Sequence, residues 1–293
     1  MGKFLLGLGS FFILFALLIF SSYCFNILLL RKSDLFESHA SKHILVLGDS
    51  HTKYAIDDSR IPSVINFSDD ADSYYYSYLK LKAIKKKSPQ IDTLLLAFSS
   101  HNIEHETEVK WLLNPIYIKS RFRFYHNLMS ASDLNSLIKL KAKDVFINLP
   151  SILTYPLHLL RKGNELYGGY EDLEINDLQG AIKRDSLKNI GKGESAYKYA
   201  ELEIVYLDKI RTYCKQEGIQ LILFSTPIFQ ENNNQAAFSD FYKSNYAGTL
   251  FIDMSKFKLQ SDCFGDLIHL NKKGAGIFSD YINYQGLSNL ENR

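Results

Sequence analysis

The hydropathy pattern of this sequence begins with an uncharged segment, Phe4–Leu30, which Lys3 precedes and Arg31 and Lys32 follow. Its 27 residues exceed the roughly 20 that a helix needs to cross a bilayer. We therefore predict a single-pass membrane anchor over residues 1–32. The charges on its two sides are nearly balanced, so the rule that cytoplasmic flanks are positive does not assign its orientation.

A cleaved signal peptide is the alternative for this segment. The apolar region of a signal peptide is shorter, and the sequence contains no clear small-x-small cleavage site. The residues before Cys24 also make a poor lipoprotein site, because Tyr23 stands where a small residue is expected. These features favour an anchor that is not cleaved.

After a polar link, residues 33–42, short apolar runs alternate with longer amphipathic segments. The first run is continuously apolar, as expected of a strand that is buried on both faces of a parallel sheet. Five runs predict strands: His43–Leu47, Val64–Phe67, Thr93–Phe98, Ile219–Phe224 and Leu250–Ile252. Three longer segments predict helices: Asp72–Lys87, Ser195–Glu217, and a last helix to about Tyr284 with Asn271 as its N-cap.

This alternation predicts an α/β domain over residues 33–293, a three-layer α/β/α sandwich around a parallel five-stranded sheet. The alternation breaks at about residues 104–194, where we predict an insertion of helices and loops that caps the sheet edge or the active site. Ligands of such sheets bind beyond the carboxyl ends of the strands. Residues directly after the apolar runs are therefore the candidates for chemistry.

Composition adds little to this interpretation. With 46% hydrophobic and 23% charged residues the chain is globular, and a formal charge of +2 gives no net field to recruit nucleic acid or acidic lipid. Three cysteines do not make a disulfide framework. A Cys214–Cys263 bridge is not established by the sequence, and buried or idle thiols are expected.

Two polar motifs follow predicted strands. Gly48-Asp49-Ser50 comes directly after the first strand, with Ser50 at the start of a helix, where backbone N–H groups can stabilise an oxyanion. Asp266 and His269 follow the fifth strand with D-x-x-H spacing, which brings a carboxylate to an imidazole. Because the two motifs share one rim of the sheet, the sequence predicts a Ser-His-Asp triad.

Further polar residues lie on the same predicted rim. Asn102 closes the sequence Ser99-Ser100-His101-Asn102 after the third strand, and its amide is a candidate oxyanion donor beside the N–H of Ser50. Four residues are candidate pocket residues: Asp49, His51, His101 and Thr226.

Together these motifs resemble the SGNH (GDSL-like) hydrolase superfamily. Gly48-Asp49-Ser50 matches its first block, and Asp266 and His269, followed by Asn271, match its last. The third block, G-x-N-D, is matched in part by Asn102, and the second lacks its glycine, although the 68–73 loop offers backbone N–H groups. The resemblance covers about Lys42–Tyr284.

The resemblance implies a flavodoxin-like parallel sheet and ester or acyl chemistry, without metal or organic cofactor. The anchor, Gly-Asp-Ser-His-Thr and D-x-x-H together resemble membrane-anchored bacterial envelope enzymes that act on acylated glycans. The expected function is therefore an esterase or O-acyltransferase for acyl, chiefly acetyl, esters of an envelope glycan or another small ester. The expected location is the extracytoplasmic (periplasmic) side of the membrane.

Two alternatives remain open at the level of the sequence. A diverged domain of this type can bind glycan without turnover, which the missing glycine of the second block favours. Gly48-Asp49-Ser50-His51 also resembles the G-D-x-H of metallophosphoesterases, but the earlier D-x-H and later G-N-H of those enzymes are absent from the sequence. His51, His101 and His105 form no evident ligand set, so no metal site is predicted.

Overall fold

The computed structural model describes residues 2–188, 197–230 and 235–285. These residues divide into two compact units: one comprises residues 1–37 and 113–166, and the other comprises residues 38–112 and 167–293. The predicted insertion, residues 104–194, therefore contributes to both units. Each unit is described by itself.

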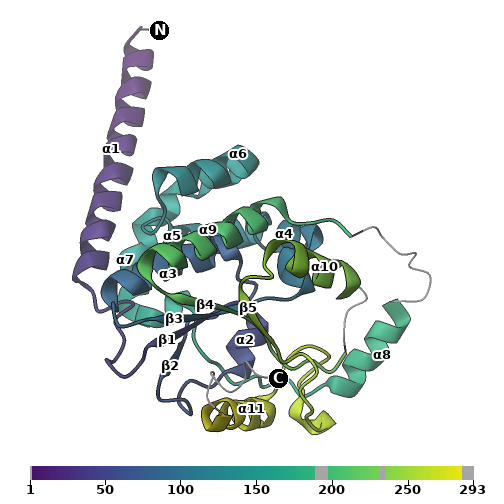
Figure 1. The fold of residues 1–293 in the computed structure, drawn as a ribbon. Helices are drawn as coiled ribbons and strands as arrows, with labels where there is room; N and C mark the ends of the chain where they lie inside the picture. Colours follow the sequence, from purple (N-terminus) through teal and green to yellow (C-terminus); the bar gives the residue numbers. More distant parts are fainter. Residues whose placement is uncertain (1, 189–196, 231–234, 286–293) are drawn as a thin grey trace. The chain divides into compact units, whose positions relative to one another are not determined.

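The larger unit is an α/β domain with a five-stranded, all-parallel sheet in the order β2-β1-β3-β4-β5 (Figure 1). The predicted fold class is thereby confirmed. All five strands lie within a residue or two of the predicted runs: β1 Ile44–Leu47, β2 Val64–Asn66, β3 Thr93–Ala97, β4 Gln220–Ser225 and β5 Leu250–Asp253.

Helices cover both faces of this sheet. Helices α3 (Tyr74–Lys87) and α9 (Glu201–Glu217) pack against each other on one face, and α2 (Ser50–Ala55) packs with α11 (Lys272–Gln285) on the other. Side chains alternate between the faces along each strand, so Val46 joins the core beneath α2 and α11, whereas the buried Leu45 points to the opposite face. Shorter helices complete the unit: α4 His105–Lys110, α8 Leu178–Lys188 and α10 Gln235–Asn245, with 3₁₀ turns at Ser100–Ile103 and Ser261–Cys263.

One predicted boundary is wrong. The helix expected from Ser195 begins at Glu201, and residues 195–196 lie outside the described residues. The preceding residues are extended, because His105 donates its N–H to the carbonyl of Lys198 and Ala200 donates to that of Ile103. Pairing with a distant segment therefore outweighs the local preference for helix at this point.

The smaller unit is helical. It contains α1 (Gly2–Lys32), α5 (Pro115–Tyr125), α6 (Ala131–Asn148), the 3₁₀ segment η2 (Leu149–Thr154) and α7 (Tyr155–Lys162). Among the described residues, α1 is the one helix long and apolar enough to cross a membrane, a property that signal sequences share. The three cysteines are free thiols, with Cys24 exposed and the other two buried.

Candidate active site

The exit from β1 explains how Ser50 is presented. A Cβ at Gly48 would collide with the Cβ of Ala97, so only glycine fits this passage between β1 and β3. Asp49 is the N-cap of α2 and accepts the N–H of His51 at 2.9 Å. Ser50 is consequently the first residue of the helix, where its N–H has no acceptor within the helix.

The predicted triad residues lie in contact. Ser50 Oγ is 2.8 Å from His269 Nε2, and His269 Nδ1 is 2.9 Å from Asp266 Oδ2. The second carboxylate oxygen of Asp266 accepts the backbone N–H groups of Ile268 and His269, each at 2.9 Å. The carboxylate is therefore fixed in orientation and directs one oxygen at the imidazole.

Hydrogen bonding also keeps Asp266 ionised. Partial burial alone would raise its pKa, but the hydrogen bond and charge of His269, with the two backbone N–H groups, lower it to about 2. An ionised Asp266 accepts a hydrogen bond from the Nδ1–H of His269, which leaves Nε2 of a neutral His269 as the acceptor that faces Ser50. This is the tautomer that a general base requires.

Backbone pairing and a helix cap hold the loop that carries Asp266 and His269 in place. Phe264 and Leu270 form an antiparallel bridge, and Asn271 caps α11 by accepting the N–H of Gly274 at 3.0 Å. A Cβ at Gly274 would collide with the carbonyl of Cys263, which explains a glycine at this position. The sequence following His269 therefore serves to hold the loop in place.

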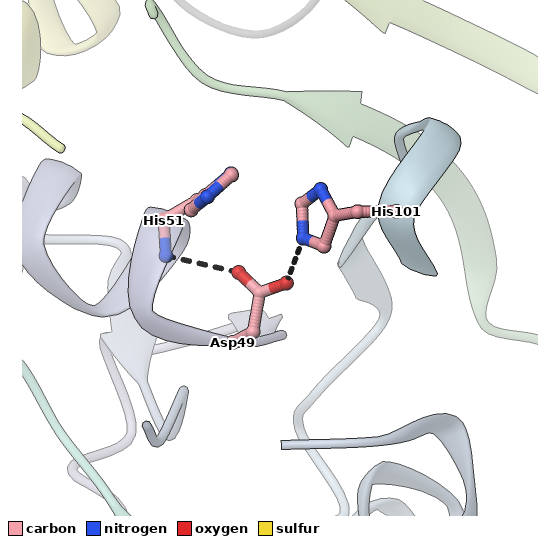
Figure 2. Close-up of side chains that lie close together, drawn as sticks. All are labelled: Asp49, His51 and His101. Carbon is pink, nitrogen blue, oxygen red and sulfur yellow. Dashed lines mark hydrogen bonds and ion pairs between the residues drawn. The ribbon is translucent and has the colours of Figure 1, made fainter. Parts of the chain in front are cut away.

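A second polar network surrounds Asp49, which is 1% exposed. Figure 2 shows its carboxylate between the backbone N–H of His51 and the ring of His101. Asp49 Oδ2 lies 2.5 Å from His101 Nε2 and accepts the amide of Asn102 at 2.7 Å. Ser99 Oγ donates to Asn102 Oδ1 at 2.9 Å and lies 2.7 Å from His101 Nδ1.

The hydrogens in this network can be assigned. An ionised Asp49 only accepts, so His101 Nε2 carries the hydrogen between them. Burial of Asp49 acts to raise its pKa, but the adjacent imidazoles of His101 and His51 hold it well below its ordinary value. Asp49 and His101 are thus joined by a short hydrogen bond in a largely buried position.

His51 lies between this network and the triad. Its ring is 4.3 Å from the ring of His101 and 5.1 Å from that of His269, measured between centroids. Burial and the positive charge of His101 lower the pKa of His51 to about 3, against the opposing charge of Asp49. His51 is therefore neutral at physiological pH and offers one donor and one acceptor beside the nucleophile.

A narrow pocket, part of it open to solvent, lies at the carboxyl ends of β3, β4 and β5. Asp49, His51 and His101 form its polar wall, and Phe98, Phe224 and Phe238 form its apolar wall. The pocket also reaches Thr226, which is buried at the end of β4. All four predicted pocket residues border this space. Ser50, Asp266 and His269 do not line this pocket themselves; their neighbours Asp49, His51 and Ile268 do. A larger, open depression lies along α11, away from these residues.

Sequence reasoning missed some residues around the site. Phe98 ends the third apolar run, and nothing in the sequence separates a pocket phenylalanine from a core one. Tyr54 meets the ring of His269 edge-on at 5.5 Å between centroids. Its spacing of four residues from Ser50, one helical turn, is the signal that points to it.

The oxyanion donors are more restricted than the sequence suggests. Five backbone N–H groups of the 68–73 loop already have acceptors. Ser68 donates to Asn66 and Asp69 donates to Gly48. The N–H groups of Asp70, Asp72 and Ser73 donate to acceptors within the loop. One hydrogen of the Asn102 amide goes to Asp49. The N–H of Ser50, the N–H of Ala71 and the second amide hydrogen of Asn102 are the remaining candidates from the predicted set.

Asp49, His51 and His101 also offer three ligand atoms within 4.8 Å of one another, a grouping that can hold a metal ion. Two ligands that each lie about 2.0–2.1 Å from a tetrahedral zinc are roughly 3.3 Å apart. The 2.5 Å between Asp49 Oδ2 and His101 Nε2 is shorter and matches a shared hydrogen. As arranged, the group fits a hydrogen-bonded pair better than a metal site.

Comparison with models of known protein families gives no match, and comparison with curated proteins gives none either. The α/β fold, with its parallel sheet and N-terminal apolar helix, is compatible with a hydrolase but identifies no family.

Proposed function

We propose that this chain is a serine esterase or O-acyltransferase of the SGNH type that uses Ser50, His269 and Asp266. The observation that carries the proposal is the 2.8 Å contact of Ser50 Oγ with His269 Nε2, backed by the 2.9 Å contact of Nδ1 with Asp266. The position of Ser50 at a helix N-terminus supports it, since backbone N–H groups there favour an oxyanion.

The reaction proceeds in two halves. Ser50 Oγ attacks the acyl carbonyl as its proton passes to His269 Nε2, and Asp266 stabilises the imidazolium that forms. The tetrahedral intermediate collapses, the alcohol leaves with the proton from Nε2, and the acyl group stays on Ser50 as an ester. In the second half His269 deprotonates the acceptor, which attacks this ester; the bond between the acyl carbon and Ser50 Oγ breaks, and the proton on Nε2 returns to Oγ. Water as the acceptor makes the protein an esterase, and a sugar hydroxyl makes it a transferase.

The proposed substrate is an acyl, chiefly acetyl, ester of a cell-envelope glycan. Resemblance of the motifs to envelope enzymes supports this choice. The proposal includes α1 as a retained anchor and an extracytoplasmic location of the larger unit. The pocket beside His51 combines polar groups with the phenylalanine wall formed by Phe98, Phe224 and Phe238. Such a pocket can accept a small acyl group next to polar sugar atoms.

Metal removal separates this proposal from a metal-dependent one. Full-length protein in detergent should hydrolyse p-nitrophenyl acetate equally well before and after EDTA, since no step of the serine mechanism uses a metal. The Asp49–His51–His101 group makes the test informative. A loss of about tenfold or more that zinc restores, with activity persisting in Ser50→Ala, would instead favour metal-activated water at that group.

A glycan-binding protein without turnover is the second candidate. One observation favours it: the Asn102 amide and five backbone N–H groups of the 68–73 loop already donate to other acceptors, so fewer donors remain for an oxyanion. The two candidates differ in whether Ser50 forms a covalent acyl-enzyme.

Asn102→Ala tests the oxyanion role under the catalytic proposal. If the second amide hydrogen of Asn102 stabilises the oxyanion, the variant should lose about 10²–10³-fold in kcat with little change in KM. The matched control is Ser99→Ala, which removes a hydrogen bond to Asn102 Oδ1 but leaves its amide in place. A folded Asn102→Ala variant with unchanged kcat would remove Asn102 from the mechanism.

A further inference from the structure

Helix α1 has two parts with different surroundings. From Gly2 to Leu18 every residue is exposed. From Ile19 onwards, partly or fully buried residues recur every three or four positions, which places them on one face: Ile19, Ser22, Tyr23, Asn26, Ile27, Leu29 and Leu30. The second part therefore packs along one side against the rest of its own unit.

The packed face includes polar contacts. Asn26 is fully buried, and its amide donates to the carbonyl of Ile152 at 2.9 Å and lies 3.4 Å from His126 Nε2. The ring of Tyr23 lies 6.0 Å from that of His126, measured between centroids. Removing α1 would leave this carbonyl and imidazole without the partners that the helix supplies. The second part of α1 is therefore a structural element of the smaller unit.

The length of the exposed part limits where a bilayer can lie. The uncharged, fully exposed residues Phe4–Leu18 span about 22 Å at 1.5 Å per residue. A hydrocarbon core is about 30 Å thick and takes about 20 helical residues. Any such span within Phe4–Leu30 includes at least Ile19–Tyr23. The elements that pack beside this stretch must then reach the membrane boundary.

In the smaller unit these elements belong to residues 113–166, which expose many apolar side chains. Residues 113–166 carry seven large exposed apolar side chains. The larger unit also exposes seven, although its described residues are more than three times as numerous. Six of the seven in residues 113–166 belong to α6, η2 and α7. The five between residues 146 and 160 are named the apolar surface: Phe146, Ile147, Leu153, Leu157 and Leu160. Leu160 also lines a depression together with Leu29 and Lys32 of α1. Leu160 of the apolar surface therefore lies beside the end of the apolar helix.

The same unit is basic. Residues 1–37 and 113–166 contain eleven Lys and Arg against five Asp and Glu, a net charge of +6. The formal charge of the whole chain is +2, so the remainder carries −4. Arg161 and Lys162 directly follow Leu160 on α7. Basic groups beside exposed apolar ones are the combination that suits the surface of an anionic bilayer.

We propose that residues 1–37 and 113–166 form a membrane-surface module. In it α1 stays attached and crosses the bilayer, the apolar surface of α6, η2 and α7 enters the interface of an anionic leaflet, and the neighbouring lysines and arginines contact lipid phosphates. This inference does not depend on the proposed catalytic function. It assigns a lipid partner to a segment that the sequence pattern presents only as an insertion.

Depth-dependent quenching in vesicles tests the proposal. The full-length protein, carrying Cys24→Ala to remove the exposed native thiol, receives Leu160→Cys or Phe146→Cys and an environment-sensitive NBD label. Val205→Cys is the matched control, because Val205 is also apolar and half exposed but lies on α9 of the larger unit. The vesicles contain phosphatidylcholine and phosphatidylglycerol, with or without a lipid that carries a nitroxide near the glycerol.

The nitroxide lipid should lower the emission of labels at positions 160 and 146 by about twofold or more and leave the label at position 205 nearly unchanged. Aqueous iodide should quench only the label at position 205. Adding Arg161→Glu and Lys162→Glu should weaken the lipid quenching at position 146. Iodide quenching at 160 and 146 would overturn the proposal, because the surface would then face water. Protection from both quenchers would also overturn it, because protein would then cover the surface. Leu157→Cys replaces either labelled variant that fails to fold.

Discussion

Ser50→Ala should abolish hydrolysis of p-nitrophenyl acetate, with a loss of about 10⁶-fold in kcat, and His269→Ala should do the same. The first variant removes the atom that attacks the carbonyl. The second removes the group that takes its proton at 2.8 Å. Because the two act in one step, the double variant should be scarcely worse than either single one.

His39→Ala is the matched control for the loss of an imidazole, because His39 is exposed and bonds only locally to Ser41. It should retain full activity. Independent losses that multiply in the double variant would show that Ser50 and His269 do not act together. Circular dichroism and thermal unfolding should be alike across the set, so that lost activity is not lost folding.

Asp266→Asn should lower kcat by about 10⁴-fold, the second largest effect that we expect. The Asn carbonyl can keep the two backbone N–H groups that Asp266 Oδ1 accepts. Its NH₂ group then faces His269 Nδ1 and donates to it. The imidazole is forced into the tautomer with its hydrogen on Nε2, which cannot accept the proton of Ser50. Activity should be reduced but measurable.

The matched control for Asp266→Asn is Asp262→Asn. Asp262 belongs to the same loop region, but its carboxylate is exposed and pairs with Lys273 at 2.7 Å. This control should change kcat less than about twofold, as expected for an exposed ion pair. Equal losses in both variants would mean that general disturbance of the loop, rather than the His269 tautomer, causes the effect.

Local sequence signals predicted the sheet and the proximity of Ser50, His269 and Asp266 for identifiable reasons. The strands are continuous apolar runs because parallel strands are buried on both faces. Ser50 and His269 could be brought together because parallel strands end on a shared rim and Asp49 and Asn271 are recognisable N-caps. These features depend on residues close together in the sequence.

The rest depends on contacts between distant segments. No residue near Asn102 in the sequence indicates that its amide binds Asp49, 53 residues earlier. The sequence therefore predicts Asn102 as an oxyanion donor without showing that Asp49 competes for its amide. The division into two units was also not foreseen, because α1 joins residues 113–166 through side chains such as Asn26. One signal was present: Ser22, Tyr23 and Asn26 are polar residues on one face of an otherwise apolar helix.

The most direct test of the central claim is covalent labelling of the full-length protein with a fluorophosphonate probe, followed by mass spectrometry of its peptides. A serine activated by an imidazole reacts with such a probe, whereas ordinary serines do not. We predict a single phosphonylated peptide, modified at Ser50, and no labelling after His269→Ala. Unmodified Ser50 in a folded protein that binds but does not cleave its esters, or a label on another serine, would contradict the account.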